Sequence, residues 1–122
     1  MEDFVVHMLS TQKSLSLKLR KKWPLNIVSQ CVQSSNVAQL DLPWICQIPF
    51  EVCQIALDRW RKTSGKNKFI IYGQFDLDFK VFQQLPEVFI YTPDYVCLKN
   101  ASFLHKLLIQ RNQYGHGRIA TI

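Results

Sequence analysis

Several segments of the chain alternate between hydrophobic and polar residues, and this pattern predicts β-strands. The clearest runs from Lys68 to Phe82, where apolar side chains fill the odd positions and mostly polar ones the even positions. Strict alternation places the two sets on opposite faces of a strand. Because this segment exceeds the usual strand length, we expect a bulge or bend at Gly73, or two strands meeting there.

Four shorter segments are also predicted to be strands. Residues 14–22 alternate leucine with serine, lysine and arginine, while 26–32 and 87–91 are rich in Val, Ile or aromatic residues. Residues 92–94, Thr-Pro-Asp, predict a turn, because proline presets φ and aspartate bonds its own backbone. A further strand at 95–98 is expected to follow that turn.

Two segments have the hydrophobic spacing of helices. The first covers about 49–62, with proline and Glu51 at its start, three basic residues in its last turn and Ser64-Gly65 after it. The second covers about 101–111, where Asn100 is the expected N-cap and the apolar stripe includes Leu104 and Leu107. Residues 4–9 also have helical spacing, although an edge strand remains the alternative there.

These elements predict one α+β domain over residues 1–122. Clusters of strands separated by two main helices, at about 49–62 and 101–111, favour a largely antiparallel sheet. The length of 122 residues suits one domain, and the apolar share of 48% is too high for a disordered chain.

The charge of the chain is positive and unevenly distributed. The formal net charge is +6, and residues 4–40 and 59–75 each hold five basic residues and no acidic one. Residues 76–94 have the opposite balance, with four acidic residues against Lys80. Such basic blocks attract anionic partners, because a polyanion releases counterions when lysine or arginine neutralises its phosphates.

We therefore predict a sequence-tolerant nucleic-acid-binding protein, with RNA or DNA as the partner. Basic side chains of both blocks would contact phosphates, and Trp23 or Tyr72 would stack on bases if exposed. The predicted contact residues are Lys13, Lys18, Arg20, Lys21, Lys22, Trp23, Arg59, Arg61, Lys62, Lys66, Lys68 and Tyr72.

The leading alternative is a protein that works by protein contact, as an oligomer or an adaptor. Eight Phe and three Trp are many for a short chain, and apolar residues that the core cannot hold mark interfaces. The many Gln, Ile, Asn and Phe and few Ala and Gly also suit a viral accessory or matrix-like protein. The basic charge is equally compatible with an acidic protein surface or an anionic membrane face.

Catalytic and metal-binding patterns are weak, so we predict a non-enzyme without a cofactor. Asp76, Asp78 and Lys80 on one strand face would resemble half of a metal-dependent nuclease site. A zinc site would need an unusual ligand set with no CxxC pair. That set consists of Cys46, Cys53, Cys97 and His105.

The sequence also bears on the compartment in which the protein works. No stretch reaches the roughly 18 consecutive apolar residues of a spanning helix. The first residues carry Glu2 and Asp3 and lack the basic residues of a secretory signal. We therefore expect an intracellular protein, cytoplasmic or nuclear, whose cysteines remain thiols.

Overall fold

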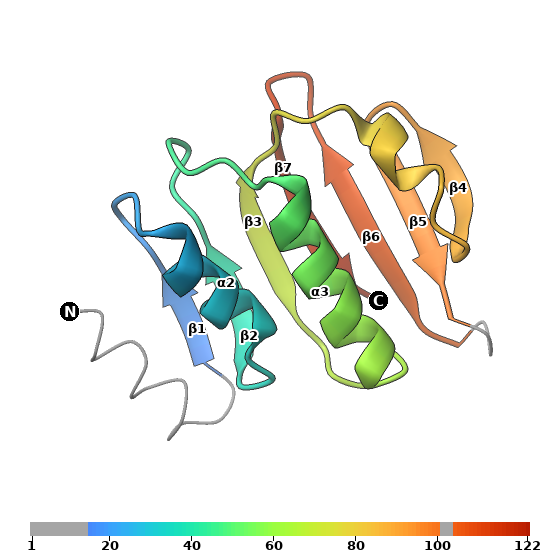
Figure 1. Ribbon diagram of the computed structural model, residues 1–122, viewed down its shortest axis with the longest axis horizontal. Helices are drawn as coiled ribbons and strands as arrows, with labels where there is room; N and C mark the ends of the chain where they lie inside the picture. Colours follow the sequence, from blue (N-terminus) through green and yellow to red (C-terminus); the bar gives the residue numbers. More distant parts are fainter. Residues whose placement is uncertain (1–14, 101–103) are drawn as a thin grey trace.

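The computed structural model describes residues 15–100 and 104–122, which form an α+β fold with two helices and one seven-stranded sheet. The sheet has the order β1-β2-β3-β7-β6-β5-β4 and is mostly antiparallel, with parallel pairing only between β1, β2 and β3. Figure 1 shows α2, α3 and the short 3-10 helix η1 on one face of this sheet. The elements are β1 (Leu15–Lys18), α2 (Leu25–Gln33), β2 (Val37–Asp41), α3 (Phe50–Lys62), β3 (Ile70–Gln74), η1 (Phe79–Phe82), β4 (Val88–Thr92), β5 (Tyr95–Lys99), β6 (Lys106–Arg111) and β7 (His116–Thr121).

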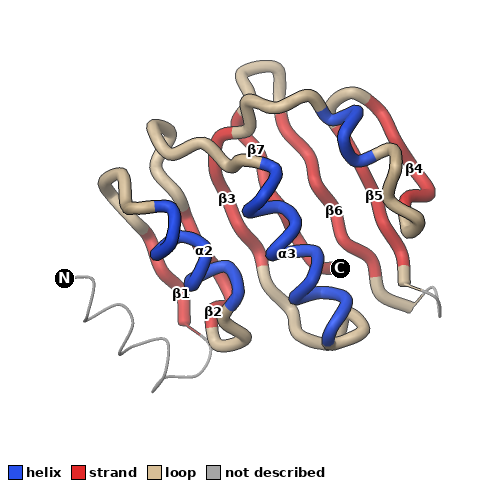
Figure 2. The backbone as a smooth tube through the Cα atoms, viewed as in Figure 1, coloured by secondary structure: helices blue, strands red, loops and turns tan. Residues whose placement is uncertain are grey.

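The hydrophobic core lies between the helices and the sheet. Both helices bury one stripe, which in α3 includes Cys53, Ala56 and Trp60 as the sequence predicts. The strands contribute alternate residues, such as Ile71 of β3 and Ile119 of β7, to the same cluster. Because only one face of each strand joins this core, the other face of the sheet turns away from the helices (Figure 2).

Several predicted elements are confirmed. The helix expected at about 49–62 is α3, and Gly65, with φ of +80°, follows its C-terminus and donates its N–H to the carbonyl of Trp60. The strands expected at 87–91 and 95–98 are β4 and β5, joined by the predicted turn. The strand expected at 14–22 is shorter, because β1 ends at Lys18.

The helix predicted over 101–111 is wrong where the structure describes it. Residues Lys106–Arg111 form β6, near the middle of the sheet, with Leu107, Leu108 and Ile109 all buried. A strand covered on both faces is apolar at consecutive positions, and such a short run does not distinguish strand from helix. Residues 101–103 lie outside the described residues, as does the segment 4–9.

The strand predicted over 26–32 is also wrong, because this segment lies in α2. Its buried residues, Ile27, Val28, Cys31 and Val32, follow the spacing of a helix face rather than strict alternation. Ile27, Val28 and Val32 are β-branched, which is typical of strands, yet packing against α3 and β2 favours the helix.

The long alternating segment forms a strand in its first part only. β3 ends at Gln74 and pairs with β7 in continuous register, so the expected bulge or bend at Gly73 is absent there. Beyond Gln74, Phe75, Phe79 and Phe82 fill the core from a loop and from η1, with ring centroids 5.7 Å and 5.2 Å apart. β2 and β7 were not among the predicted elements.

Candidate nucleic-acid interface

The face of the sheet opposite α2, α3 and η1, which we call the rear face, carries its own set of side chains. Leu40, Ile109 and Ile119 belong to the core on the helix side, so their strand neighbours point to the rear. Cys97, Leu108 and Ala120 are buried but are not members of that core cluster. The rear face therefore has a second apolar layer, and within the described residues no helix covers it (Figure 1).

The strand register arranges this face into three rows that run across the strands, with neighbouring rows about 6.6 Å apart. The tyrosine row consists of Tyr72, Arg118, Gln110 and Tyr95. The apolar row consists of Ile70, Ala120, Leu108, Cys97 and Ile90. The lysine row consists of Lys68, Ile122, Lys106 and Lys99.

The lysine row brings together three cations from separate parts of the chain. Lys99 and Lys106 are direct cross-strand partners, and their Nζ atoms lie 4.6 Å and 5.7 Å from the ring centroid of Phe89. Lys68 Nζ donates to the carbonyl of Ile122 at 3.1 Å and lies 3.2 Å from Nδ1 of His105. Lys99 and Lys106 therefore bring two positive charges close together over one aromatic ring.

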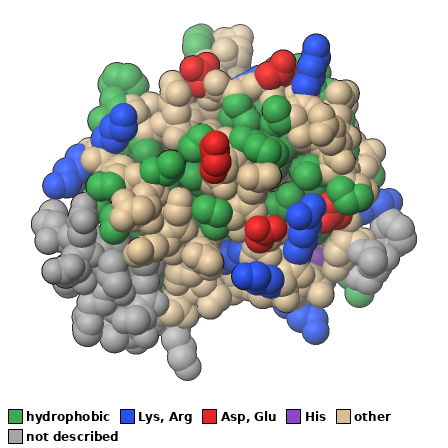
Figure 3. All heavy atoms as spheres, viewed as in Figure 1, with side chains coloured by type: hydrophobic (Ala, Val, Ile, Leu, Met, Phe, Trp, Pro, Cys, Tyr) green, Lys and Arg blue, Asp and Glu red, His purple; other side chains and the backbone are tan. Residues whose placement is uncertain are grey.

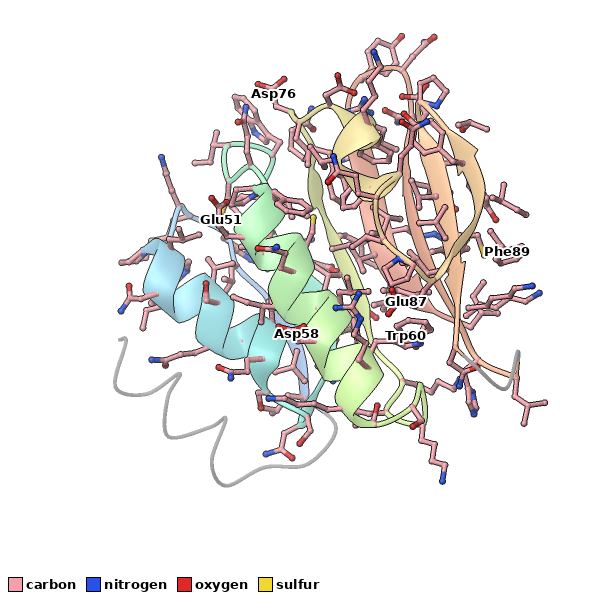
Figure 4. The ribbon with its side chains drawn as sticks, turned by 45° about the vertical axis from the view of Figure 1, so that its right-hand side comes forward. Glu51, Asp58, Trp60, Asp76, Glu87 and Phe89 are labelled. Carbon is pink, nitrogen blue, oxygen red and sulfur yellow. The ribbon has the colours of Figure 1, made fainter. Side chains whose placement is uncertain are left out.

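A bulge in β4 presents two apolar side chains on the rear face. The register between β4 and β5 shifts between Val88 and Ile90, where Phe89 is the extra residue. Phe89 and Ile90 are both exposed, and Figure 4 shows Phe89 pointing away from the helices. The bulge thus places an aromatic ring beside the lysines.

A shallow groove of about 550 Å³ follows the apolar row toward β2. It is apolar along Ile70, Leu108 and Ala120, and Lys68 and Arg118 lie on its walls. Nε of Arg118 is buried and makes no hydrogen bond to any described residue. A buried guanidinium donor without a partner costs free energy, which a hydrogen-bond acceptor in this groove would recover.

The thiol on this face is not a reactive one. Burial raises the pKa of Cys97, and the nearby Lys106 and Tyr95 lower it less than burial raises it. The thiol therefore stays protonated at neutral pH, and the thiolate is the nucleophilic form.

Carboxylates are concentrated away from the rear face. Asp41, which accepts from Gln39 Nε2, is the only acidic residue at a rear-facing strand position among the described residues. Figure 3 shows Asp and Glu side chains interspersed with Lys and Arg on the opposite, helix-bearing face. There, Glu87 pairs with Arg61, and Figure 4 shows Glu51 and Asp58 on α3. The rear face is therefore the more positive one.

The two basic blocks of the sequence, both predicted to contact phosphates, do not form a single surface. Arg20, Lys21 and Lys22 follow the C-terminal end of β1, whereas Lys62 and Lys66 lie near the start of β3. Since β1, β2 and β3 are parallel, these groups lie at opposite ends of the sheet (Figure 1). Of the predicted contacts, Lys18, Lys68 and Tyr72 lie on the rear face, and Lys13 lies outside the described residues.

Three predicted contact residues have structural partners instead. Arg59 is 5% exposed; its guanidinium donates to the carbonyls of Val32 and Val37 and to Asn67 and stacks over Phe69. Burial lowers the pKa of Arg59 to about 10, still well above neutral pH. Arg61 is paired with Glu87, and Trp23 is buried beneath Lys21. We therefore leave Arg59, Arg61 and Trp23 out of the interface.

The prediction that Asp76, Asp78 and Lys80 share one strand face is wrong. All three follow the end of β3, and Asp78 accepts the backbone N–H of Lys80 as the N-cap of η1. Asp76 accepts from Gln47 Nε2 at 3.4 Å.

The four candidate zinc ligands are not brought together either. Cys46 precedes α3, Cys53 is inside it, Cys97 is on β5 and His105 precedes β6. Within residues 15–100 and 104–122, no group of three His, Cys, Asp or Glu residues has the spacing to hold a metal ion. All four cysteines are free, buried thiols.

Sequence reasoning missed much of the rear face. Lys99 and Lys106 fall outside both basic blocks and become neighbours only when β5 pairs with β6. Arg118 and Tyr95 join Tyr72 in one row only through the register of four strands. The available signal was the apolar run 107–109, which, read as a strand, would have made a hairpin with β5.

Comparisons with protein-family models, with curated proteins and with solved structures find no match to this chain. None of the helices in the described part is long and apolar enough to cross a membrane.

Proposed function

We propose that this protein binds single-stranded nucleic acid on the rear face of its sheet. Phosphates lie along the lysine row, and bases pack against Phe89 and the tyrosine row. The observation that carries the proposal is the opposed pair Lys99 and Lys106 over one aromatic ring, beside an apolar stripe, on a face where Asp41 is the only acidic side chain at a strand position among the described residues.

A single strand fits this surface better than a duplex. Aromatic side chains offer planar contact to base faces, which a single strand exposes and a duplex hides in its stack. The lysines supply sequence-independent attraction to phosphates, and Arg118 supplies a fixed donor within the groove. The expected binding is sequence-tolerant, because few groups are placed to read base edges.

The direct test is a titration of labelled single strands of about 10 nucleotides, followed by fluorescence anisotropy at low salt. The parent protein should bind poly-uridine and poly-thymidine strands more tightly than a hairpin duplex. The double variant Lys99→Gln/Lys106→Gln should lose most of this affinity. The matched control, Lys62→Gln/Lys80→Gln, removes two exposed charges on the helix side and should retain it.

Two results would refute the proposal. One is the absence of single-strand binding at low ionic strength, where phosphate attraction is strongest. The other is an equal loss of affinity in both double variants, which would show that net charge matters and the rear face does not. A far-UV circular dichroism spectrum of each variant confirms that its fold is intact.

A further inference from the structure

A second exposed patch lies at the end of the sheet where the parallel strands terminate. It consists of three large apolar side chains, Leu25, Trp44 and Ile45, which are 54%, 76% and 45% exposed. Leu25 begins α2 after the β1–α2 loop, and the other two belong to the β2–α3 loop. Figure 1 shows these two loops projecting side by side beyond the sheet. We call this surface the Trp44 patch.

Basic residues border the Trp44 patch. Arg20, Lys21 and Lys22 are consecutive and exposed on the β1–α2 loop, and residues 15–40 contain no carboxylate. A groove of about 380 Å³ separates the loops and is lined by Lys22, Leu25 and Ile45, with no acidic residue on its walls. The acidic residues nearest along the chain, Asp41 and Glu51, lie on β2 and α3, and Asp76 accepts from Gln47 of the β2–α3 loop.

We propose that the Trp44 patch docks onto an anionic lipid bilayer. Trp44, Ile45 and Leu25 enter the interfacial region of the bilayer, and the cations of the β1–α2 loop face lipid phosphates. Tryptophan favours the membrane interface because its ring is apolar and its N–H stays near the polar headgroups. Two weak signals, apolar insertion and a basic cluster, together produce stable attachment.

The composition of the patch favours lipid over nucleic acid. Two of its three apolar side chains, Leu25 and Ile45, are aliphatic and have no flat face on which a base can stack. All three lie on or beside the projecting loops. A flat bilayer can therefore contact them without touching the rear face. This proposal uses none of the rear-face residues and does not depend on nucleic-acid binding.

The protein carries its own reporter of this contact. Of its three tryptophans, Trp23 and Trp60 are buried and Trp44 is exposed. The full chain is titrated with vesicles of phosphatidylcholine containing roughly one phosphatidylserine in three lipids. We expect a blue shift of the Trp44 emission and protection from acrylamide. Pure phosphatidylcholine vesicles should give a much weaker response, and Trp44→Phe should remove the shift while the protein still sediments with the vesicles.

Matched variants distinguish binding through the Trp44 patch from nonspecific binding to vesicles. Trp44→Ser/Ile45→Ser should lower vesicle co-sedimentation at least tenfold, whereas Leu104→Ser, at a residue 77% exposed near the other end of the sheet, should leave it unchanged. Lys21→Gln/Lys22→Gln should lower binding about 25-fold, at about fivefold for each charge. Lys62→Gln/Lys66→Gln should change vesicle binding less than about twofold. These two charges lie near the start of β3, more than a Debye length from the docked membrane, so salt screens them.

Three results would overturn the proposal. The first is the absence of an emission shift with anionic vesicles in the parent protein. The second is an equal loss of binding in the patch variant and in Leu104→Ser. The third is a shift of Trp44 emission produced by single-stranded oligonucleotides and not by vesicles, which would assign the patch to nucleic acid.

Discussion

Replacing both lysines of the Lys99–Lys106 pair with glutamine should flatten the salt dependence of oligonucleotide binding. The lysine row provides three cations, the third being Lys68. For single strands, each neutralised phosphate adds about 0.7 to the slope of log affinity against log salt, so three contacts give a slope of about −2.1. A rise from about 50 mM to about 200 mM salt then weakens binding about 18-fold.

The variant Lys99→Gln/Lys106→Gln keeps one cation of the row. Its slope should fall to about −0.7, and the same change of salt should weaken its binding only about 2.6-fold. Because the slope counts released ions, it separates loss of phosphate contacts from a general loss of affinity.

Fluorescence anisotropy at four salt concentrations between these limits measures both slopes. The helix-side control, Lys62→Gln/Lys80→Gln, should keep the parent slope. If the control flattens the slope as much as the rear-face variant does, the phosphates are not on the lysine row. A parent slope near zero would also show that the lysine row does not neutralise phosphates.

Three further substitutions test the interface and the fold. Lys106→Glu should abolish oligonucleotide binding, because a carboxylate directly opposite Lys99 repels phosphates at the lysine row; an unchanged affinity in fluorescence anisotropy would contradict this. Arg59→Met should destabilise the fold by about 2 to 4 kcal/mol in urea unfolding, since two buried carbonyls lose a charged donor; a loss under about 1 kcal/mol would show that these bonds are replaced. The hydrogen bond from Arg61 lowers the pKa of Glu87, so the ion pair stabilises the fold above the ordinary value of 4.5, and this contribution is lost as the pH falls through the lowered value. The free energy of unfolding should therefore differ between the parent and Glu87→Gln by up to about 1 kcal/mol at neutral pH, and this difference should shrink below pH 4.5; a constant difference would contradict the pairing.

The sequence predicts an element well where local signals agree. In α3, the proline at its start, Glu51 in its first turn, a single apolar stripe and the glycine after its end all indicate the same helix. In the β4–β5 hairpin, the turn residues and the flanking β-branched and aromatic residues agree in the same way. In both cases the local sequence preferences and the tertiary packing favour the same structure.

The failure at β6 occurs because burial on both sides removes the periodic signal. β6 has partners on both edges and buried side chains on both faces, so Leu107, Leu108 and Ile109 have no polar residue between them. For the same reason, the Lys99–Lys106 pair of the candidate site was not predicted. Tyr72 was found because β3 alternates, whereas the Lys99–Lys106 pair depends on recognising β6 as a strand.

The order of the strands has a consequence for how the chain folds. Strands β4 to β7 are successive neighbours, so their pairing closes only short loops. β3 joins them by contacts such as the bond from Phe69 N to Thr121 Oγ1, which spans 52 residues. Because closing a long loop costs more chain entropy, the C-terminal meander should assemble first and provide β7 as a template for β3. Pulse-labelled hydrogen exchange during refolding should find amides of β5 and β6 protected before those of β2; the reverse order would mean that nucleation begins in the parallel half.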